Sequence, residues 1–321
     1  MVAPIASDPG GGVTPYDRMA FSAADVSRWL ARGEHAQLLQ TLFGPDAHAE
    51  LVPLAIAAEA AEARQRRSRR RTIAPRVWIL PGIMGSLLGL PRDAGSPPDI
   101  LWLDALDIII GRLTRLRTDA TPPVQPMGVL LPTYLRLSLR LTAAGFAPKF
   151  FDYDWRRDLC EVGRDFAAAL RADGRTASIV AHSMGGIVAR AALTQGSLPD
   201  VERVLLVGTP NFGSFASVQA LRGTYSVVRK LALLDLRHDA EELASGVFST
   251  FPSLYHLLPF GRAAEGVDFH RAANWPTNGP RPEPARLRAA RNLEQSLAPA
   301  DSRFIVIAGI EIGRASCRER V

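Results

Sequence analysis

A serine set in a tight turn has the clearest chemical potential in this sequence. Ser183 lies in the run Ala-His-Ser-Met-Gly-Gly at 181–186, between an apolar run typical of a buried strand and a helical pattern at 187–193. Strand, turn and helix in this order are the context in which a small-x-Ser-x-Gly motif presents a nucleophile. The residues two before and two after the serine must be small because strand and helix approach closely, and Ala181 and Gly185 meet that limit. The pattern predicts that the Ser183 hydroxyl projects above a sheet as a catalytic nucleophile.

A Gly-rich turn earlier in the chain predicts a second part of the same site. The run Trp-Ile-Leu-Pro-Gly-Ile-Met-Gly-Ser at 78–86 follows an early apolar strand. We expect the backbone N–H groups of Ile83 and Met184 to converge on a carbonyl oxygen as it becomes anionic. Losing one such oxyanion-hole donor typically costs on the order of 100–1,000-fold in turnover. A Gly-rich turn without a ligand is the alternative for this run.

Short apolar runs that alternate with helical patterns indicate how these turns are positioned. Strands are expected at 77–80, 149–153, 177–182, 201–207 and 304–308, with helical stretches such as 162–171 and 185–194 between them. This alternation predicts an α/β fold with a parallel sheet covered by helices on both faces. Ligands of such sheets bind at the carboxyl ends of the strands, which is where both turns would lie.

The first 75 residues predict a small helical segment that ends in an Arg-rich linker. Ser22, with Asp25 in the following turn, is typical of a helix start, and apolar residues at near-helical spacing continue to Phe43. A second, Ala-rich helix is expected from about Ala47 to Arg67, broken or started near Pro53. The α/β domain is expected over 76–311, with a lid at about 214–302.

Composition and charge narrow the class of protein. The chain has 321 residues, of which 47% are hydrophobic and 22% charged, and this excludes wholesale disorder and fibrous repeats. Two cysteines without metal-ligand spacing predict neither a disulfide framework nor a metal or other cofactor. Much of the net charge of +6 comes from an Arg-rich run at 64–71, interpreted as a solvated linker, with an anion-binding tether as the alternative. The absence of a secretion signal and of a membrane-length apolar run predicts a cytoplasmic protein.

Five sequence blocks together resemble the lecithin:cholesterol acyltransferase-like branch of the α/β-hydrolase superfamily. They lie, in the order of that family, at 79–86, 151–156, 181–186, 208–214 and 251–259. The resemblance covers 77–309 and implies an α/β-hydrolase fold with a lid insertion. It also implies an O-acyltransferase or lipase of lipid metabolism that forms an acyl-enzyme on Ser183. The family places Asp154, Trp155 and Arg156 near the site, as a wall, a positioning group or a purely structural element.

The resemblance further implies a triad whose acid and histidine are missing from this chain. The superfamily order is Ser, Asp or Glu, then His, and 303–309 looks like the strand that precedes the acid. Residues 312–321 have no apolar period and read like the translation of a sequencing adapter, so we expect a truncated chain in which Cys317 is not native. A histidine must take the serine proton, so the 321-residue chain is expected to be essentially inactive. An exposed apolar strand edge would also make it poorly soluble.

Four histidines, one directly before Ser183 and three further along the chain, are possible substitutes for the missing base. His182 is the x of the motif and is expected to point away from Ser183. His238, His256 and His270 fall in the lid stretch, and His270 is the best of these because Asp268 lies two residues before it. None of the four is assigned as the base.

The leading functional hypothesis is a lipid O-acyltransferase or lipase. The alternatives are a general carboxylesterase that uses water, and a non-enzymatic lipid- or anion-binding module that keeps the fold. The expected partner is a lipid or ester substrate, with peripheral contact to a membrane or lipid surface, and no nucleic acid is expected. The lid and an insertion near 100–116 are rich in apolar residues, which suits an acyl chain or, equally, ordinary core packing.

Overall fold

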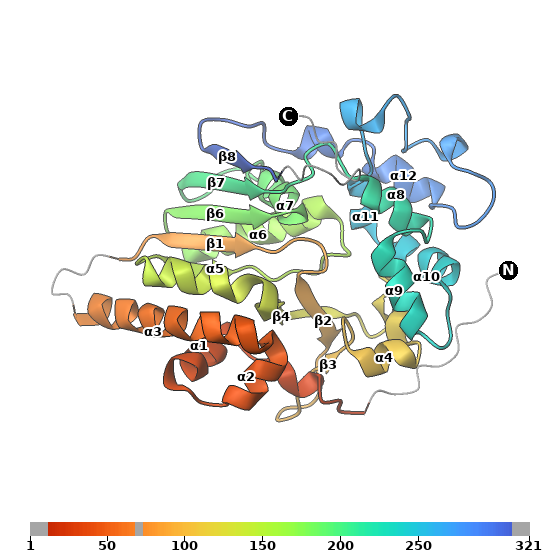
Figure 1. The fold of residues 1–321 in the computed structure, drawn as a ribbon. Helices are drawn as coiled ribbons and strands as arrows, with labels where there is room; N and C mark the ends of the chain where they lie inside the picture. Colours follow the sequence, from red (N-terminus) through yellow and green to blue (C-terminus); the bar gives the residue numbers. More distant parts are fainter. Residues whose placement is uncertain (1–11, 68–72, 310–321) are drawn as a thin grey trace.

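The centre of the molecule is a five-stranded parallel sheet. The computed structural model describes residues 12–67 and 73–309. The sheet has the order β5-β1-β6-β7-β8, and each neighbouring pair is parallel. Its strands are β1 (Arg76–Leu80), β5 (Ala147–Phe150), β6 (Ala177–His182), β7 (Val201–Val207) and β8 (Phe304–Ile307). The predicted parallel sheet is confirmed, and its strands end along one edge, to the right in Figure 1.

One predicted strand was placed too late in the sequence. The pattern predicted a strand over 149–153, whereas β5 ends at Phe150. The chain then leaves the sheet, because the Tyr153 N–H donates to the Ser86 hydroxyl at 3.2 Å and the Tyr153 hydroxyl donates to the Pro81 carbonyl at 2.6 Å. The apolar run beyond Phe150 therefore belongs to the loop that supports the β1 turn.

Helices cover both faces of the sheet, and β1 contributes side chains to each face. Trp78 and Leu80 belong to the core that contains α6 (Leu159–Asp173) and α7 (Met184–Ala192). Ile79 points the other way, into a second apolar cluster that includes α5 (Leu131–Ala143) and the N-terminal helices. This alternation follows from the two-residue period of a strand, and it makes β1 the boundary between the two clusters.

The N-terminal segment forms helices that pack on α5, as Figure 1 shows. They are α1 (Ala23–Arg32), α2 (Ala36–Phe43) and α3 (Pro45–Arg67), preceded by the short turn η1 (Asp17–Met19). The predicted cap is present, since the Ser22 side chain accepts from the Asp25 N–H. The apolar run to Phe43 is split in two, because Gly33 ends α1 with a φ of 69°.

The expected break near Pro53 does not occur, because α3 runs through it. Pro53 is exposed, whereas Leu51 and Ala55 on either side of it are buried. The carbonyl that lacks its helical donor therefore faces water, while the apolar face of α3 packs on its neighbours.

An insertion after β1 forms a small second sheet that the sequence did not predict. It has the order β3-β2-β4 and consists of β2 (Ser86–Leu90), β3 (Asp99–Ile100) and β4 (Gln125–Val129). The pairs are antiparallel. The helix α4 (Ala105–Ile109) and the turn η2 (Arg112–Leu116) belong to the same insertion.

A long helical segment between β7 and β8 occupies the predicted lid. It contains α8 (Phe215–Leu221), α9 (Ser226–Leu234), α10 (Ala240–Gly246), η3 (Phe248–Thr250), α11 (Pro252–His256), η4 (Gly261–Ala264), η5 (Ala272–Asn274), α12 (Pro284–Ala290) and η6 (Leu293–Ser296). In Figure 1 these helices gather beyond the carboxyl ends of the strands. Across residues 12–67 and 73–309, no helix combines the length and the apolar character needed to cross a bilayer.

Several predictions fall on parts of the chain outside the described residues. They concern Arg69, Arg70 and Arg71 of the basic run, and the tail at 312–321 with Cys317. The first part of the run, including Arg64 and Arg67, forms the last turn of α3. The predicted domain boundaries stay predictions.

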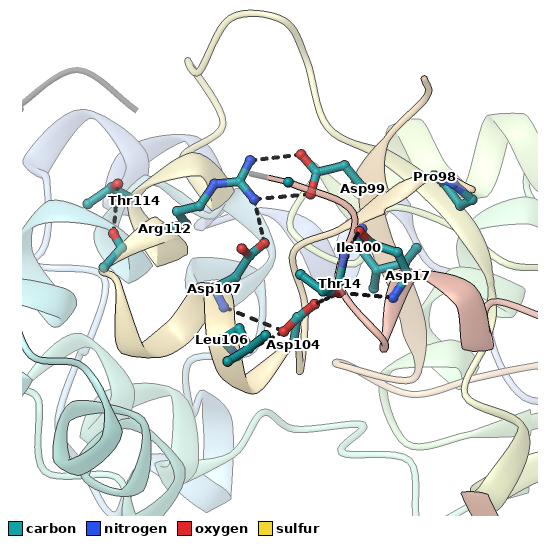
Figure 2. A network of polar contacts seen from close by, with 12 residues as sticks. Thr14, Asp17, Pro98, Asp99, Ile100, Asp104, Leu106, Asp107, Arg112 and Thr114 are labelled. Atoms are coloured by element: carbon teal, nitrogen blue, oxygen red, sulfur yellow. Dashed lines mark hydrogen bonds and ion pairs between the residues drawn. The ribbon is translucent and has the colours of Figure 1, made fainter. Parts of the chain in front are cut away.

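Buried ion pairs hold the insertion together. The Arg112 guanidinium donates to both oxygens of Asp99, at 3.0 and 2.7 Å, and to Asp107 at 2.6 Å, as Figure 2 shows. All three residues are buried. Burial raises the pKa of Asp107 to about 6, in spite of the hydrogen bond from Arg112.

The same network anchors the residues before α1 to the insertion. The buried Asp17 carboxylate accepts from the Ile100 N–H at 2.7 Å. The Thr14 hydroxyl bonds to Asp104, whose side chain caps α4 by accepting from Leu106 N–H. Figure 2 shows these contacts beside the Arg112 pairs. The helix α4 is therefore held at two points, by Thr14 through its cap Asp104 and by Arg112 through Asp107.

Replacing Arg112 by alanine should lower the free energy of unfolding by about 3–5 kcal/mol, because it leaves buried carboxylates without their counter-ion. The measurement is urea unfolding at pH 7. Arg157→Ala is the matched control, since Arg157 pairs with Glu161 and Asp165 at an exposed site, and its cost should stay below about 1 kcal/mol. Equally small decreases in the free energy of unfolding of both variants would contradict the assignment of Arg112 as the counter-ion of the buried carboxylates.

Candidate active site

Ser183 occupies a strained turn at the carboxyl end of β6. It joins β6 to α7 with a φ of 52° and a ψ of −126°. A left-handed conformation of this kind costs a residue with a side chain on the order of 1–3 kcal/mol, so its neighbours must enforce it. The Ser183 N–H donates to the Val207 carbonyl at the end of β7, at 2.8 Å. The side chain is partly exposed, and its hydroxyl has no hydrogen-bond partner within the described residues.

Two glycines allow the helix after Ser183 to approach its neighbours. A Cβ atom on Gly185 would lie 2.6 Å from the Pro81 carbonyl oxygen and 2.8 Å from that of Leu80. A Cβ atom on Gly186 would overlap the Thr209 side chain. The size limit predicted for Gly185 therefore has a direct cause, which is the closeness of α7 to the end of β1.

Replacing Gly185 by alanine should lower the free energy of unfolding by about 1–3 kcal/mol, because backbone atoms must move to admit the methyl group. Gly246→Ala is the matched control. Gly246 ends α10, and an added Cβ there would meet nothing within 4 Å. The control should be neutral or slightly stabilising. Denaturant unfolding of both variants makes the comparison, and a loss confined to the control would refute the steric argument.

The turn after β1 lies directly against the Ser183 turn. A Cβ atom on Gly82 would be 2.9 Å from the Ser183 Cβ. Ile83 follows Gly82, and Met184 follows Ser183, so the two predicted oxyanion-hole donors belong to turns in contact. Their N–H groups donate to no acceptor in the part of the chain that the structure describes. Met184 is the first residue of α7, where helical N–H groups lack an intrahelical acceptor.

Aromatic side chains fix the β1 turn from three directions. Tyr153 donates to Pro81, as described above, the Trp102 indole donates to the Met84 carbonyl at 3.2 Å, and the Tyr134 hydroxyl accepts from the Gly82 N–H at 2.9 Å. The sequence analysis missed the role of Tyr134 entirely. The available signal was one tyrosine within an otherwise Leu-, Arg-, Ser- and Thr-rich helical pattern at 131–143.

Asp154 and Arg156 act as structural residues. Arg156 forms a two-point ion pair with Asp154, at 2.8 Å from Nε and 2.7 Å from Nη2. It also donates to the carbonyls of Leu116 at 2.6 Å and Val124 at 3.3 Å. Both charged residues are buried. The pair thus ties the β5 loop to the insertion, which is the structural alternative of the sequence analysis.

None of the histidines bonds to the Ser183 hydroxyl. The sequence has six histidines, and all lie within the described residues. The His182 Nδ1 lies 3.0 Å from the Tyr134 hydroxyl. The His238 Nδ1 lies 3.0 Å from Asp235. Two further imidazoles belong to a lid pocket. Within the described residues, no histidine is therefore hydrogen-bonded to Ser183 as a general base would be.

The lid pocket has a volume of about 230 Å³, and Ser183 does not line it. His256 and His270 both line this pocket, together with Asp268 and Arg291. Burial lowers the pKa of His256, against the opposing effect of Asp158. Burial likewise lowers the pKa of His270, in spite of Asp268. Within the described residues no group of three or more His, Cys, Asp or Glu side chains could hold a metal ion.

The buried imidazole of His256 should make stability depend on pH. Its pKa in the folded protein lies below the ordinary value of 6.5, so the unfolded chain binds the proton first as pH falls. Its contribution is therefore complete above about pH 6.5 and lost as pH falls through the folded pKa. The free energy of unfolding should fall between pH 7.5 and 5.0, and it should fall less in His256→Gln.

Urea unfolding at both pH values measures this difference, with His48→Gln on α3 as the control that keeps the full decrease. Identical decreases in His256→Gln and the unmodified protein would show that His256 is not the titrating group.

Comparison with known proteins bears on the fold. No protein-family model and no curated protein matches this sequence. A chain from the crystal structure of the Tle4–Tli4 complex is similar, with a TM-score of 0.55 and 15% identity over 73% of this chain and 74% of that one. Bacillus licheniformis lipase BlEst2 in mature form has a TM-score of 0.30 and 22% identity over 56% of this chain and 57% of that one. The first likeness, with the parallel sheet and the helices around it, shows that this chain has the α/β-hydrolase fold.

Proposed function

We propose that Ser183 is the nucleophile of a lipid O-acyltransferase or lipase that works through an acyl-enzyme. One observation carries the proposal. Ser183 adopts a φ of 52° at the turn between β6 and α7, and its hydroxyl has no partner within the described residues. Strain of this kind persists where the surrounding structure enforces it, and it is typical of functional sites.

The proposed reaction uses both turns in the same step. The Ser183 oxygen attacks the acyl carbon of an ester, and the negative charge that forms on the carbonyl oxygen faces the N–H groups of Ile83 and Met184. Collapse of this intermediate breaks the bond to the alcohol, which leaves as its oxygen takes a proton. An acceptor alcohol, or water, then attacks the acyl-enzyme and frees Ser183.

A group beside Ser183 must accept the serine proton during the attack. The same group must then donate a proton to the oxygen of the departing alcohol. An imidazole oriented by a carboxylate normally fills both roles. The triad acid and histidine implied by the family resemblance stay a prediction, because no described histidine bonds to Ser183.

The lipid character of the substrate rests on the resemblance and on apolar side chains in the lid. Phe212 and Phe215, which follow β7 at the carboxyl edge of the sheet, are both more than a third exposed. Leu233 in the last turn of α9 and Leu236, two residues beyond that helix, are 82% and 81% exposed. Exposed apolar groups of this kind also support the proposed peripheral contact with a lipid surface. A cytoplasmic location and a lack of nucleic-acid binding stay predictions.

A fluorophosphonate probe tests the nucleophile. In the natural gene product the probe should label Ser183 alone, and Ser183→Ala should abolish labelling. Peptide mass spectrometry locates the adduct. With the histidines placed as in this structure, reaction at Ser183 should be slow, because loss of the catalytic base in a well-studied serine protease costs on the order of a million-fold. Lack of Ser183 labelling in the natural protein would favour the non-enzymatic binding module.

Acyl length separates an apolar acyl pocket from a general esterase site. If the lid helices cover an acyl chain, kcat/KM of the natural gene product for p-nitrophenyl esters should rise from acetyl to octanoyl, because each buried methylene contributes about 0.8 kcal/mol. Steady-state rates on the ester series give the trend, with Ser183→Ala as the background. A steep decrease with chain length would favour the carboxylesterase.

A further inference from the structure

One hydroxyl group links the turn after β1 to the turn that carries Ser183. Tyr134 lies on α5, outside both turns, and is 5% exposed. Its oxygen accepts from the Gly82 N–H at 2.9 Å and lies 3.0 Å from His182 Nδ1. Gly82 directly precedes the proposed oxyanion-hole donor Ile83, and His182 directly precedes Ser183.

The direction of the hydrogen bonds follows from the groups involved. Because Gly82 donates to the Tyr134 oxygen, the proton of Tyr134 must be directed to another acceptor. The Nδ1 atom of His182 lies at hydrogen-bond distance from that oxygen, and it can accept the proton when His182 is neutral with its own proton on Nε2. Burial lowers the pKa of His182 and raises that of Tyr134. Both shifts agree with a neutral imidazole and an intact hydroxyl.

Steric crowding leaves the three groups little freedom to separate. A Cβ atom on Gly82 would lie 3.1 Å from His182 Nδ1, besides its contact with the Ser183 Cβ. A Cβ atom on Gly85 would lie 2.8 Å from the Tyr134 hydroxyl oxygen. The glycine backbone at Gly82 and Gly85 therefore lies close to these groups, and the Tyr134 hydroxyl supplies the polar link between the two turns.

We propose that Tyr134 is a positioning residue: it holds the Gly82 amide, and with it the Ile83 N–H, in a fixed place relative to Ser183. His182 serves as the proton acceptor of Tyr134. This assigns a role to the histidine of the serine motif other than that of general base. The catalytic part of the inference rests on the proposed function. The hydrogen-bonded link itself does not.

Spectroscopy tests the link in the 321-residue chain without any need for activity. In the unmodified protein, ¹⁵N NMR should show His182 with an unprotonated Nδ1, and the Gly82 amide should exchange slowly with solvent. In Tyr134→Phe, exchange of the Gly82 amide should rise at least about ten-fold, as expected when an N–H group loses its protecting hydrogen bond. The His182 Nδ1 resonance should also shift.

Tyr255→Phe is the matched control. Tyr255 is also buried, and its hydroxyl donates to the Ser249 carbonyl at 2.8 Å and accepts from the Glu283 N–H at 3.0 Å. Its loss should cost stability comparably but leave the Gly82 and His182 signals unchanged. Unchanged signals in Tyr134→Phe, or equal changes in both variants, would overturn the link.

Substitutions of the exposed His182 give a second route if Tyr134→Phe does not fold. In His182→Asn, the amide oxygen can replace Nδ1 as acceptor, so protection of the Gly82 amide should persist. In His182→Leu, the Tyr134 proton loses its acceptor, and protection should weaken. Equal protection in the two variants would overturn the assigned role of His182.

Kinetics of the natural gene product test the catalytic part. Tyr134→Phe should lower kcat for an ester about 10–100-fold, less than the loss of a whole oxyanion-hole donor, and change KM less than about two-fold. A parallel rise in KM, or an unchanged kcat, would overturn the positioning role. Absence of any Ser183-dependent turnover would instead overturn the proposed function, and the NMR results would still decide whether the link exists.

Discussion

The contact between the start of α7 and the end of β1 is the constraint on which the site depends. The main chain at Gly185 lies so close to the Leu80 and Pro81 carbonyls that a methyl group would not fit. This approach holds the start of α7 against the end of β1 and brings the Ser183 turn next to the Gly82 turn. In this turn Ser183 has a φ of 52°, and its side chain is partly exposed. The proposed chemistry needs each of these features at once.

Buried charges position the loops around this contact, where the apolar core alone could not. The Asp154–Arg156 pair ties the loop after β5 to the insertion, and Arg112 ties β3 to α4 within the insertion. A buried ion pair adds little net stability over apolar packing, but it is strongly destabilising to break, so it defines one loop arrangement against others. Loops that shape a substrate pocket need ion pairs that favour one arrangement, because they lack the regular hydrogen bonds of helices and strands.

The sequence predicted the elements with a strong local period, and it missed those that depend on distant partners. Strands β6 and β7 have the predicted bounds, because each is a short run dominated by apolar residues that ends at a Gly-containing turn. The end of β5 was wrong, since Tyr153 leaves the sheet for partners on Ser86 and Pro81. Pro53 was expected to break a helix that packing maintains. Tyr134 stands out only as a lone tyrosine in its helix, and its role could not be assigned from sequence because its partners Gly82 and His182 lie 52 and 48 residues away on either side.

The alternating side chains of β1 mean that the two apolar clusters meet only a few residues before the oxyanion turn. Ile79 lies in the cluster of the N-terminal helices, whereas Trp78 and Leu80 lie in that of α6 and α7. The remote helices α1 and α3 therefore share an apolar cluster with the strand that leads into the Gly82 turn. A substitution in those helices can reach the turn through packing alone, so the N-terminal segment belongs to the structural support of the proposed site.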